Sequence, residues 1–338
     1  MQVESSTPCR IDLAGGTLDI HPLYLFMEGG ITVNMAIDLL SWVRLETRSD
    51  REVHLSSEDT GAELTAPSVE ELPLDQELSL VARVVRFYAP ETGLNITTRN
   101  TAPQGSGLGS SSALLIALSG ALRESGHLEL NNQRLIDNAA NLEAQVIRIP
   151  TGKQDYYAAM YGGVNAIWFR VDADSIEPLI VHESGLSELE QRIVLSFTGE
   201  SRFSGTNNWN MMRAYIDRRA QTVGSLNAIK ETALRMREAL AAGDHGRFGE
   251  LIDEEWQNRK RLAKGVTTSR IDRLMAAARS AGALATKICG AGGGGCMISV
   301  VEPRDRAAVE KALTEAGAEV LAFHIARRGL TIMRDSER

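Results

Sequence analysis

The residues most suited to chemistry in this chain are a dense stretch of glycines and serines from Pro103 to Ala113. Glycines at alternate positions let the main chain approach a ligand with its N–H groups exposed. Three consecutive serines then open a strongly apolar segment typical of a buried helix, and a helix N-terminus carries a partial positive charge. The pattern predicts an anion cradle, most naturally for phosphates. A flexible surface turn is the alternative, and the spacing fits neither a Walker A loop nor a dinucleotide-binding GxGxxG loop.

Two further glycine clusters lie near the two ends of the chain. The segment from Arg10 to Asp19 combines a guanidinium, carboxylates and a hydroxyl with a double glycine, which indicates either a polar site or a salt-bridged turn. The segment from Lys287 to Cys296 places four consecutive glycines between two predicted strands, more than a hairpin turn needs. We expect this loop to pack against a ligand or another glycine loop, with a flexible linker as the alternative.

Two carboxylates stand out by their positions. Glu143 falls on an apolar stripe of a helix predicted from Asn131 to Ile147, and a buried carboxylate must pair with a cation or lie near a metal. Asp155 follows a Pro-Thr-Gly turn and begins a new apolar segment. The alternatives are a solvated Glu at the edge of the stripe and an Asp that only caps a helix.

The elements that must position these residues indicate an α+β protein. Strands in the first half are predicted at 31–36, 42–47, 52–55, 94–98 and 164–169, with helices at 110–122 and 131–147. In the second half, helices are predicted at 215–242, 245–263, 270–281 and 305–316, and strands at 284–289, 296–301, 319–326 and 330–333. The acidic segment 171–190, broken by a proline and a glycine, is the candidate domain boundary.

Composition limits the possible functions of the chain. The 338 residues include 36 Lys plus Arg against 44 Asp plus Glu, a net charge of −8, and the length suggests two domains. We expect no nucleic-acid partner because no long basic tract could neutralise phosphates, and no membrane partner because no apolar run approaches about 18 residues. The absence of an export signal and the sparse cysteines Cys9, Cys289 and Cys296 predict a cytoplasmic protein with reduced thiols, without a zinc site or disulfides.

Together these clusters resemble the GHMP kinase family, named for galactokinase, homoserine kinase, mevalonate kinase and phosphomevalonate kinase. The family's phosphate motif, P-x-G-x-G-L-G-S-S-x-A, is matched at every fixed position from Pro103 to Ala113, and its K-x-x-G-A-G-G-G-G motif is matched from Lys287 to Gly295. The resemblance implies an N-terminal α+β domain with a left-handed βαβ unit at 1–180 and a C-terminal ferredoxin-like domain at 181–338. It also implies a cleft between them for MgATP and substrate.

The resemblance implies specific roles as well. Ser111 and Glu143 would hold Mg²⁺, a hard cation that prefers oxygen ligands. Asp155 would be the general base, with Arg10 keeping it ionised and polarising the attacking oxygen. Because some family members are argued to work without a base, the role of Asp155 is a hypothesis. The phosphates of ATP would be bound by Pro103, Gly105, Ser106, Gly107, Leu108, Gly109, Ser110, Ser111 and Ser112.

Within the family, the chain looks most like the bacterial heptose-phosphate kinases and the kinase portion of fucokinases. The double glycine before Thr17, the Gly-Lys-Gln-Asp that ends at Asp155, and Tyr161-Gly162-Gly163 carry this likeness, whereas the Glu and His of the galactokinase motif are absent. The likeness implies a sugar pocket lined by Thr17, Asp19, Gly162, Gly163, Gly292 and Gly293. Arg202 is either a clamp for an anionic group or an ordinary surface arginine.

The expected reaction is transfer of the γ-phosphate of ATP to a sugar hydroxyl. The acceptor would be the anomeric hydroxyl of a heptose 7-phosphate or a related aldose. Two alternatives stay open: a kinase of a non-sugar alcohol such as mevalonate, and a sugar and ATP sensor that has lost turnover. The oligomeric state is not indicated by the sequence.

Overall fold

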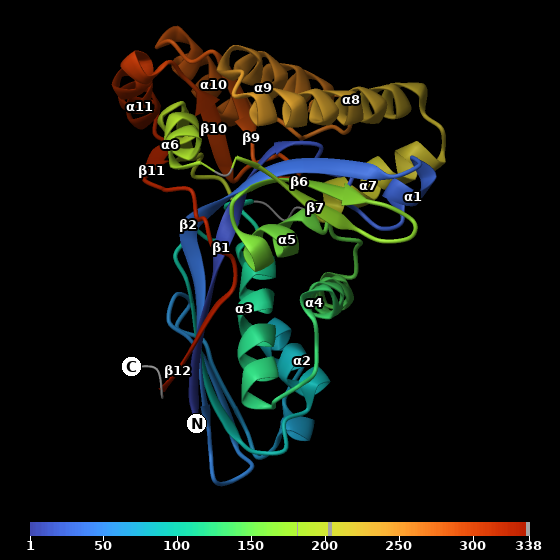
Figure 1. The fold of residues 1–338 in the computed structure, drawn as a ribbon, viewed down its shortest axis with the longest axis vertical. Coiled ribbons are helices and arrows are strands. Elements are labelled where there is room, and N and C mark those ends of the chain that lie inside the picture. Colours follow the sequence, from blue (N-terminus) through green and yellow to red (C-terminus); the bar gives the residue numbers. More distant parts are fainter. Residues whose placement is uncertain (181, 202–204, 336–338) are drawn as a thin grey trace.

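The computed structural model of the protein describes residues 1–180, 182–201 and 205–335. Its first part contains β1 (Gln2–Ala14), α1 (Leu23–Phe26), β2 (Gly30–Thr47), β3 (Val53–Ser57), β4 (Glu63–Ala66), α2 (Ser79–Tyr88), β5 (Leu94–Asn100), α3 (Ser110–Ser125), α4 (Asn132–Ile147), α5 (Gln154–Tyr161), β6 (Val164–Phe169) and β7 (Ser175–Ile180). There follow α6 (Glu183–Gln191), β8 (Ile193–Phe197), α7 (Gly205–Ile216), α8 (Ala220–Ala242), α9 (His245–Arg259), α10 (Ser269–Ser280), β9 (Ala285–Ile288), β10 (Cys296–Val300), α11 (Arg306–Glu315), β11 (Glu319–Leu321) and β12 (Thr331–Arg334). Figure 1 shows α2, α3 and α4 on one side of a tall sheet, and α8 to α11 over a second sheet.

The first sheet has the strand order β12-β1-β2-β5-β3-β4, and β6 and β7 extend from β2. The two strands predicted at 31–36 and 42–47 form one continuous strand, β2. Between the two predicted segments, β2 changes its pairing partner. Its first half pairs with β6 and its second half with β5, while β1 accompanies both halves through a register shift after Pro8. β3 and β5 are parallel, and the connection between them passes through α2, as a parallel pair requires.

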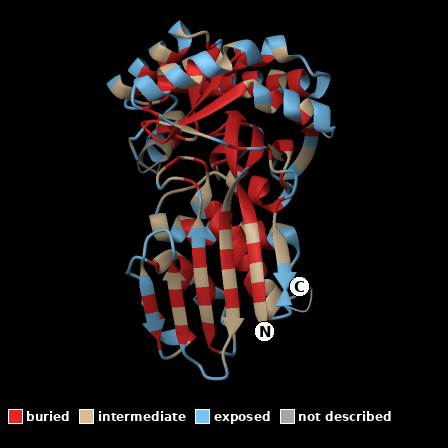
Figure 2. Cartoon of the chain, turned by 90° about the vertical axis from the view of Figure 1, so that its left-hand side faces the viewer, coloured by how far each residue is buried: buried red, intermediate tan, exposed pale blue. Residues whose placement is uncertain are grey.

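Burial along β1 shows where the two units meet. From Gln2 to Thr7 its residues alternate between buried and half-buried, whereas every residue from Thr7 to Ala14 is buried. One face of the first part of the sheet is covered by helices and the other is open, so the strands show alternating exposure in Figure 2. The helices α8 and α9 of the second unit contact β1, whose C-terminal half is buried throughout. The glycines and carboxylates of the segment from Arg10 to Asp19 therefore lie between the units.

The helix that follows the phosphate motif is buried, as predicted. The eleven residues from Ser112 to Leu122 are all buried, and α3 packs on β1 and β2. Two strand hydroxyls bond to its main chain, since Ser5 Oγ donates to the carbonyl of Ala117 and Thr7 Oγ1 to that of Ala113. α3 is thereby fixed along its length, which holds its N-terminus at the end of β1.

The second sheet has the order β11-β8-β10-β9 with antiparallel neighbours throughout. Numbered along the chain this is 4-1-3-2, the order of a ferredoxin-like sheet. The helices α7, α8 and α9 are inserted between β8 and α10. The single helix predicted at 215–242 is divided, because α7 ends at Ile216 and Arg218 adopts a left-handed conformation with φ of 53° before α8 begins.

The end of the chain returns to the first sheet. β11 stops at Leu321, earlier than predicted, and β12 pairs with β1 from Val3 to Ser6. The connecting segment bonds to β2, since the N–H of Ala326 donates to the carbonyl of Ala36. The division at residue 180 and the hand of the crossover stay predictions, but the last strand of the segment 181–338 lies in the N-terminal sheet. Within the described residues, no helix combines the length and apolarity needed to cross a membrane.

Candidate active site

The first glycine cluster forms a loop that leads into α3. Gly105, Gly107 and Gly109 have φ of 70°, 71° and 77°, which L side chains rarely adopt. Gly109 is the N-cap residue of α3, so the N–H groups of the first helical turn have no partner within the helix. The arrangement supplies donors and a partial positive charge in one place, as phosphate binding needs.

The third glycine cluster packs against this loop. A Cβ on Gly107 would lie 2.9 Å from the carbonyl oxygen of Cys289, and one on Gly295 would lie 2.5 Å from that of Ser106. The N–H of Cys296 also donates to Ser106 O at 2.6 Å. The expectation that the four-glycine loop packs against another glycine loop is therefore confirmed. Side chains at these positions would push the two units apart.

Arg10 and Asp155 meet beside the phosphate loop. Arg10 Nε donates to Asp155 Oδ1 at 2.6 Å, and Arg10 Nη1 donates to the carbonyl of Gly107 at 2.6 Å. Asp155 is in the first turn of α5, and a Cβ on Gly109 would lie 2.9 Å from its Cγ. Burial raises the pKa of Asp155, although the neighbouring Arg10 opposes this effect. A carboxylate with a raised pKa, held by a guanidinium at the end of a phosphate loop, can accept a proton from a nearby hydroxyl.

Glu143 lies behind the first turn of α3. It accepts hydrogen bonds from the hydroxyls of Ser112, at 2.8 Å, and Tyr156. Burial raises the pKa of Glu143, against the lowering effect of hydrogen bonds from Tyr156, Ser111 and Ser112. Ser112, predicted to bind phosphate, is buried and donates its hydroxyl to Glu143, so its main-chain N–H is the group that could contact a phosphate. Tyr156 was not singled out in the sequence, although its position next to Asp155 in an apolar helix was a signal.

Ser111 and Glu143 fit a divalent cation. Ser111 is exposed at the start of α3, and its hydroxyl interacts with the Glu143 carboxylate. A bound cation would offset the cost of burying this carboxylate, and two protein oxygens leave room for phosphate oxygens and water, which suits Mg²⁺. No cluster of three or more His, Cys, Asp or Glu that could hold a metal occurs in the described part of the chain. Such a cation would therefore depend on the phosphates of a nucleotide for much of its coordination.

A small cavity of about 90 Å³ lies next to Asp155. It is lined by Arg10, Gly16, Thr17, Asp19, Ile20, Thr151, Gly152, Gln154, Asp155, Asn208, Arg259, Gly290 and Ala291. Asp19 is buried and its Oδ2 accepts from the N–H of Gln154 at 3.0 Å. Burial, aided by the charge of Asp155, raises the pKa of Asp19 to about 6. Thr17 and Asp19 thus line the same cavity as Asp155 and could bind hydroxyl groups.

Under this cavity, four buried charged residues join the two units. Lys287 Nζ donates to Asp12 Oδ2 and to Asp12 O at 2.7 Å each, and lies 3.8 Å from Glu255 Oε2. Glu255 also pairs with Arg259, whose Nη2 donates to Gly16 O at 2.9 Å. Sequence reasoning did not single out Glu255 and Arg259. Their spacing of four on a helix whose buried face includes Phe248 and Ile252 was the available signal.

Several predicted substrate residues do not reach the cavity. Gly162 and Gly163 lie at the other end of α5 from Asp155, where the N–H of Gly163 donates to the carbonyl of Ala326. Gly292 packs on Val266, and the N–H of Gly293 donates to the carbonyl of Val266. Gly290 and Ala291 of the same loop line the cavity instead. Arg202 lies outside the described residues.

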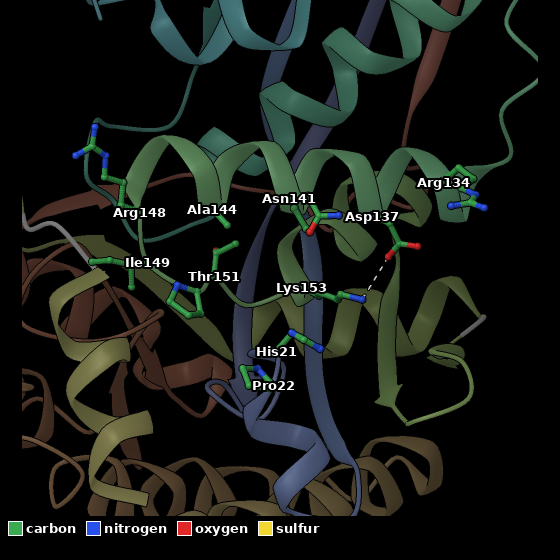
Figure 3. A pocket seen from close by; sticks show the side chains of 12 residues that line it. His21, Pro22, Arg134, Asp137, Asn141, Ala144, Arg148, Ile149, Thr151 and Lys153 are labelled. Atoms are coloured by element: carbon green, nitrogen blue, oxygen red, sulfur yellow. Dashed lines mark hydrogen bonds and ion pairs between the residues drawn. The ribbon is translucent and has the colours of Figure 1, made fainter. Parts of the chain in front are cut away.

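A wider groove of about 660 Å³ runs along α4 (Figure 3). It shares Thr151 with the cavity beside Asp155. Figure 3 shows Arg134 and Arg148 at opposite ends of the helix, with Lys153 between them. Lys153 Nζ lies 3.3 Å from Asp137 and 3.0 Å from Asp174, so nearby carboxylates compensate its charge. The basic groups of the larger groove are therefore spread along α4. By contrast, Arg10, Asp19 and Asp155 lie together at the smaller cavity.

Comparisons with known proteins agree with this geometry. The models for the GHMP kinases N terminal domain and the GHMP kinases C terminal match residues 79–163 and 236–319. The chain is 31% identical over 338 residues to D-glycero-alpha-D-manno-heptose 7-phosphate kinase of Campylobacter jejuni, covering 98% of this chain and 99% of the relative. It is 26% identical to mevalonate kinase of Pyrococcus furiosus, with 98% of each chain covered.

A solved structure is also similar along the whole chain. The crystal structure of a D-glycero-D-manno-heptose 1-phosphate kinase from Bacteroides thetaiotaomicron matches with a TM-score of 0.80 and 30% identity, covering 98% of this chain and 99% of that one. The chain belongs to the GHMP kinase family. The predicted family and the two-domain α+β fold are confirmed.

Proposed function

We propose that this protein is an ATP-dependent kinase that transfers the γ-phosphate to a sugar hydroxyl. The acceptor would be the anomeric hydroxyl of a heptose 7-phosphate or a related aldose. The observation that carries the proposal is the contact of Arg10 with both Asp155 and the phosphate loop, beside a cavity that contains Asp19 and Thr17. Phosphate donor and hydroxyl acceptor would thus meet at one carboxylate. The names of the relatives support a sugar acceptor.

Each residue of the site would have a definite task. The free N–H groups of the loop and of α3 hold the phosphates, while Arg10 fixes the carboxylate of Asp155 toward the cavity. Asp155 accepts the proton of the attacking hydroxyl, and Asp19 and Thr17 orient the sugar. Ser111 and Glu143 would hold Mg²⁺, which would supply positive charge to offset the negative charge of the phosphates. The three free, buried cysteines accord with a cytoplasmic location.

The test is ³¹P NMR of the purified protein with MgATP and a panel of aldoses, heptose 7-phosphate and mevalonate. We expect a new anomeric phosphate signal with a sugar, and its loss in Asp155→Asn. A new signal with mevalonate alone would replace the sugar kinase by a kinase of another alcohol. Binding of ATP and sugar without release of ADP above a no-sugar control would show a sensor and overturn the proposal.

A further inference from the structure

Arg259 is the second guanidinium of the small cavity, and its bonds to Glu255 and Gly16 do not use all of its donors. It ends α9 and is 1% exposed, yet it lines the cavity together with Arg10, Asp19 and Asp155. Arg10 is committed to Asp155 and the phosphate loop. A buried cation is costly unless it is paired, so the surroundings of Arg259 decide what it can do.

Its hydrogen bonds leave one side of the guanidinium available. Nε and Nη2 donate to Glu255 Oε1, and Nη2 also donates to Gly16 O at 2.9 Å. Nη1 has a single partner among the described residues, Thr17 Oγ1 at 3.4 Å, which is long for such a bond. Since Nη1 carries two N–H groups, it has donor capacity to spare at the wall of the cavity.

The charge of Arg259 and the orientation of its guanidinium are fixed before any substrate binds. Burial opposes the charged form, but Glu255, Asp12 and Asp19 outweigh it and raise the pKa of Arg259. Two bonds to Glu255 lock the plane of the guanidinium, and Lys287 stabilises the acidic partners. Asp19, in the same cavity, can accept hydrogen bonds but not donate them when ionised. A hydroxyl can donate to Asp19 and accept from Arg259, so the pair suits a polyol.

We infer that Arg259 binds the acceptor substrate, with Nη1 donating a hydrogen bond to one of its hydroxyl oxygens and Glu255 positioning the guanidinium. The inference rests on the proposed function in one respect, the identity of the acceptor as a sugar. It adds a residue of α9 to the substrate-binding groups Thr17 and Asp19 of the first unit. Sugars that lack the hydroxyl in question would be discriminated against, because a buried donor would then be left unpaired.

The test combines Arg259→Lys with a series of deoxy sugars. The lysine keeps the charge beside Glu255 but loses the fixed fork. We expect the KM for the sugar to rise about tenfold or more, which corresponds to the loss of one charged hydrogen bond. The KM for ATP should stay within about twofold of the wild-type value. For the deoxy sugar that lacks the hydroxyl bound by Arg259, the wild type and the variant should have the same KM. Arg261→Lys, at an exposed arginine two positions on, is the matched control and should change neither constant.

Two results would overturn the inference: an unchanged KM for the acceptor, or the same penalty for every deoxy sugar, which would mean a purely structural role. Thermal unfolding of each variant accompanies the kinetics, and Arg259→Gln replaces the lysine variant if the latter does not fold. If the wild type phosphorylates another alcohol and no sugar, the proposed function fails, whereas the effect of Arg259→Lys on the KM for that alcohol still decides the role of Arg259.

Discussion

Lys287 donates hydrogen bonds to both the carboxylate and the main-chain carbonyl of Asp12, at 2.7 Å each, across 275 positions of the chain. Both side chains are fully buried. Because Lys287 is on β9 and Asp12 on β1, this pair joins the second sheet to the first directly beneath the cavity. The lysine of the family's C-terminal motif is thus an anchor between the two units.

Lys287→Met should destabilise the protein by about 3–5 kcal/mol, because it leaves the carboxylate of Asp12 buried with less compensating charge. Urea unfolding monitored by circular dichroism measures the change. Lys311→Met removes an exposed lysine that lies 3.8 Å from Glu315, and should change stability by less than about 0.5 kcal/mol. Equal effects of the two variants would contradict the anchoring role of Lys287.

Asp155→Asn should lower kcat by about 10²-fold or more while the KM for ATP stays near normal. Loss of the proposed base acts mainly on the transition state, because an asparagine cannot accept the proton. Steady-state kinetics with both substrates varied measure the effect. Asp253→Asn, on α9 and paired with Arg279, is the control and should leave kcat unchanged. Wild-type turnover in the Asp155 variant would remove this residue from the reaction.

Ser111→Ala should raise the Mg²⁺ concentration needed for half-maximal activity, because an oxygen ligand is lost next to Glu143. The measurement is activity against free Mg²⁺ at fixed ATP. Ser125→Ala provides the control at the other end of α3, where the hydroxyl only donates to the carbonyl of Leu122. An unchanged Mg²⁺ titration for Ser111→Ala would place the cation elsewhere.

Asp19→Asn should stabilise the protein at pH 7 and weaken sugar binding. The pKa of Asp19 is raised from 3.8 to about 6 by burial, so the folded state binds this proton more tightly than the unfolded state. Stability contributed by the protonated form is present below about pH 4 and is lost as the pH rises through 6. The loss amounts to at most about 3 kcal/mol, which the variant would recover.

Unfolding free energies of wild type and Asp19→Asn from pH 4 to 8 measure this difference. The gain of the variant should be near zero at pH 4 and largest above pH 6. Asp217→Asn, at a half-exposed aspartate 3.8 Å from Arg213, is the matched control and should change the unfolding free energy by less than about 0.5 kcal/mol. A gain for Asp19→Asn that is the same at pH 4 and pH 8 would show that ionisation is not its cause.

Gly109→Ala should strongly reduce turnover and also lower stability. Its φ of 77° is strained for alanine, and the new Cβ would lie 2.9 Å from Cγ of Asp155. Gly224→Ala on α8 is the control, because its Cβ would meet nothing within 4 Å, and it should stabilise the helix by about 0.5–1 kcal/mol. The measurements are thermal unfolding and kcat for both variants. Normal turnover in Gly109→Ala would contradict the close packing at Asp155.

The phosphate loop and its helix could be predicted from the sequence because their determinants are local. Alternating glycines allow φ values that other residues rarely adopt, and serines before a dense apolar run favour a helix start wherever the chain lies in space. The same holds for α4, predicted at 131–147 and observed from Asn132 to Ile147. The motifs that carry the family resemblance are local in the same sense, which is why the family was evident without a structure.

Residues whose role depends on distant partners were harder to predict. Gly162 and Gly292 pack against the main chains of Arg328 and Val266, not against the cavity, and no local pattern specifies such a neighbour. Arg259 and Glu255 lie on a helix that a sequence pattern describes only as amphipathic. The contact of Arg259 with Gly16 and Thr17, and that of Glu255 with Lys287, arise from the docking of the two units.

The sequence by itself therefore determined the family and predicted a phosphate cradle and a candidate base, because each depends on backbone geometry and residue types within a few positions. Only the tertiary structure decided that β12 returns to the first sheet, that Lys287 anchors Asp12, and that Arg259 reaches the cavity. Contacts between residues more than 200 positions apart are set by how two apolar surfaces pack, and buried charges can then select their partners only among the groups that this packing brings together.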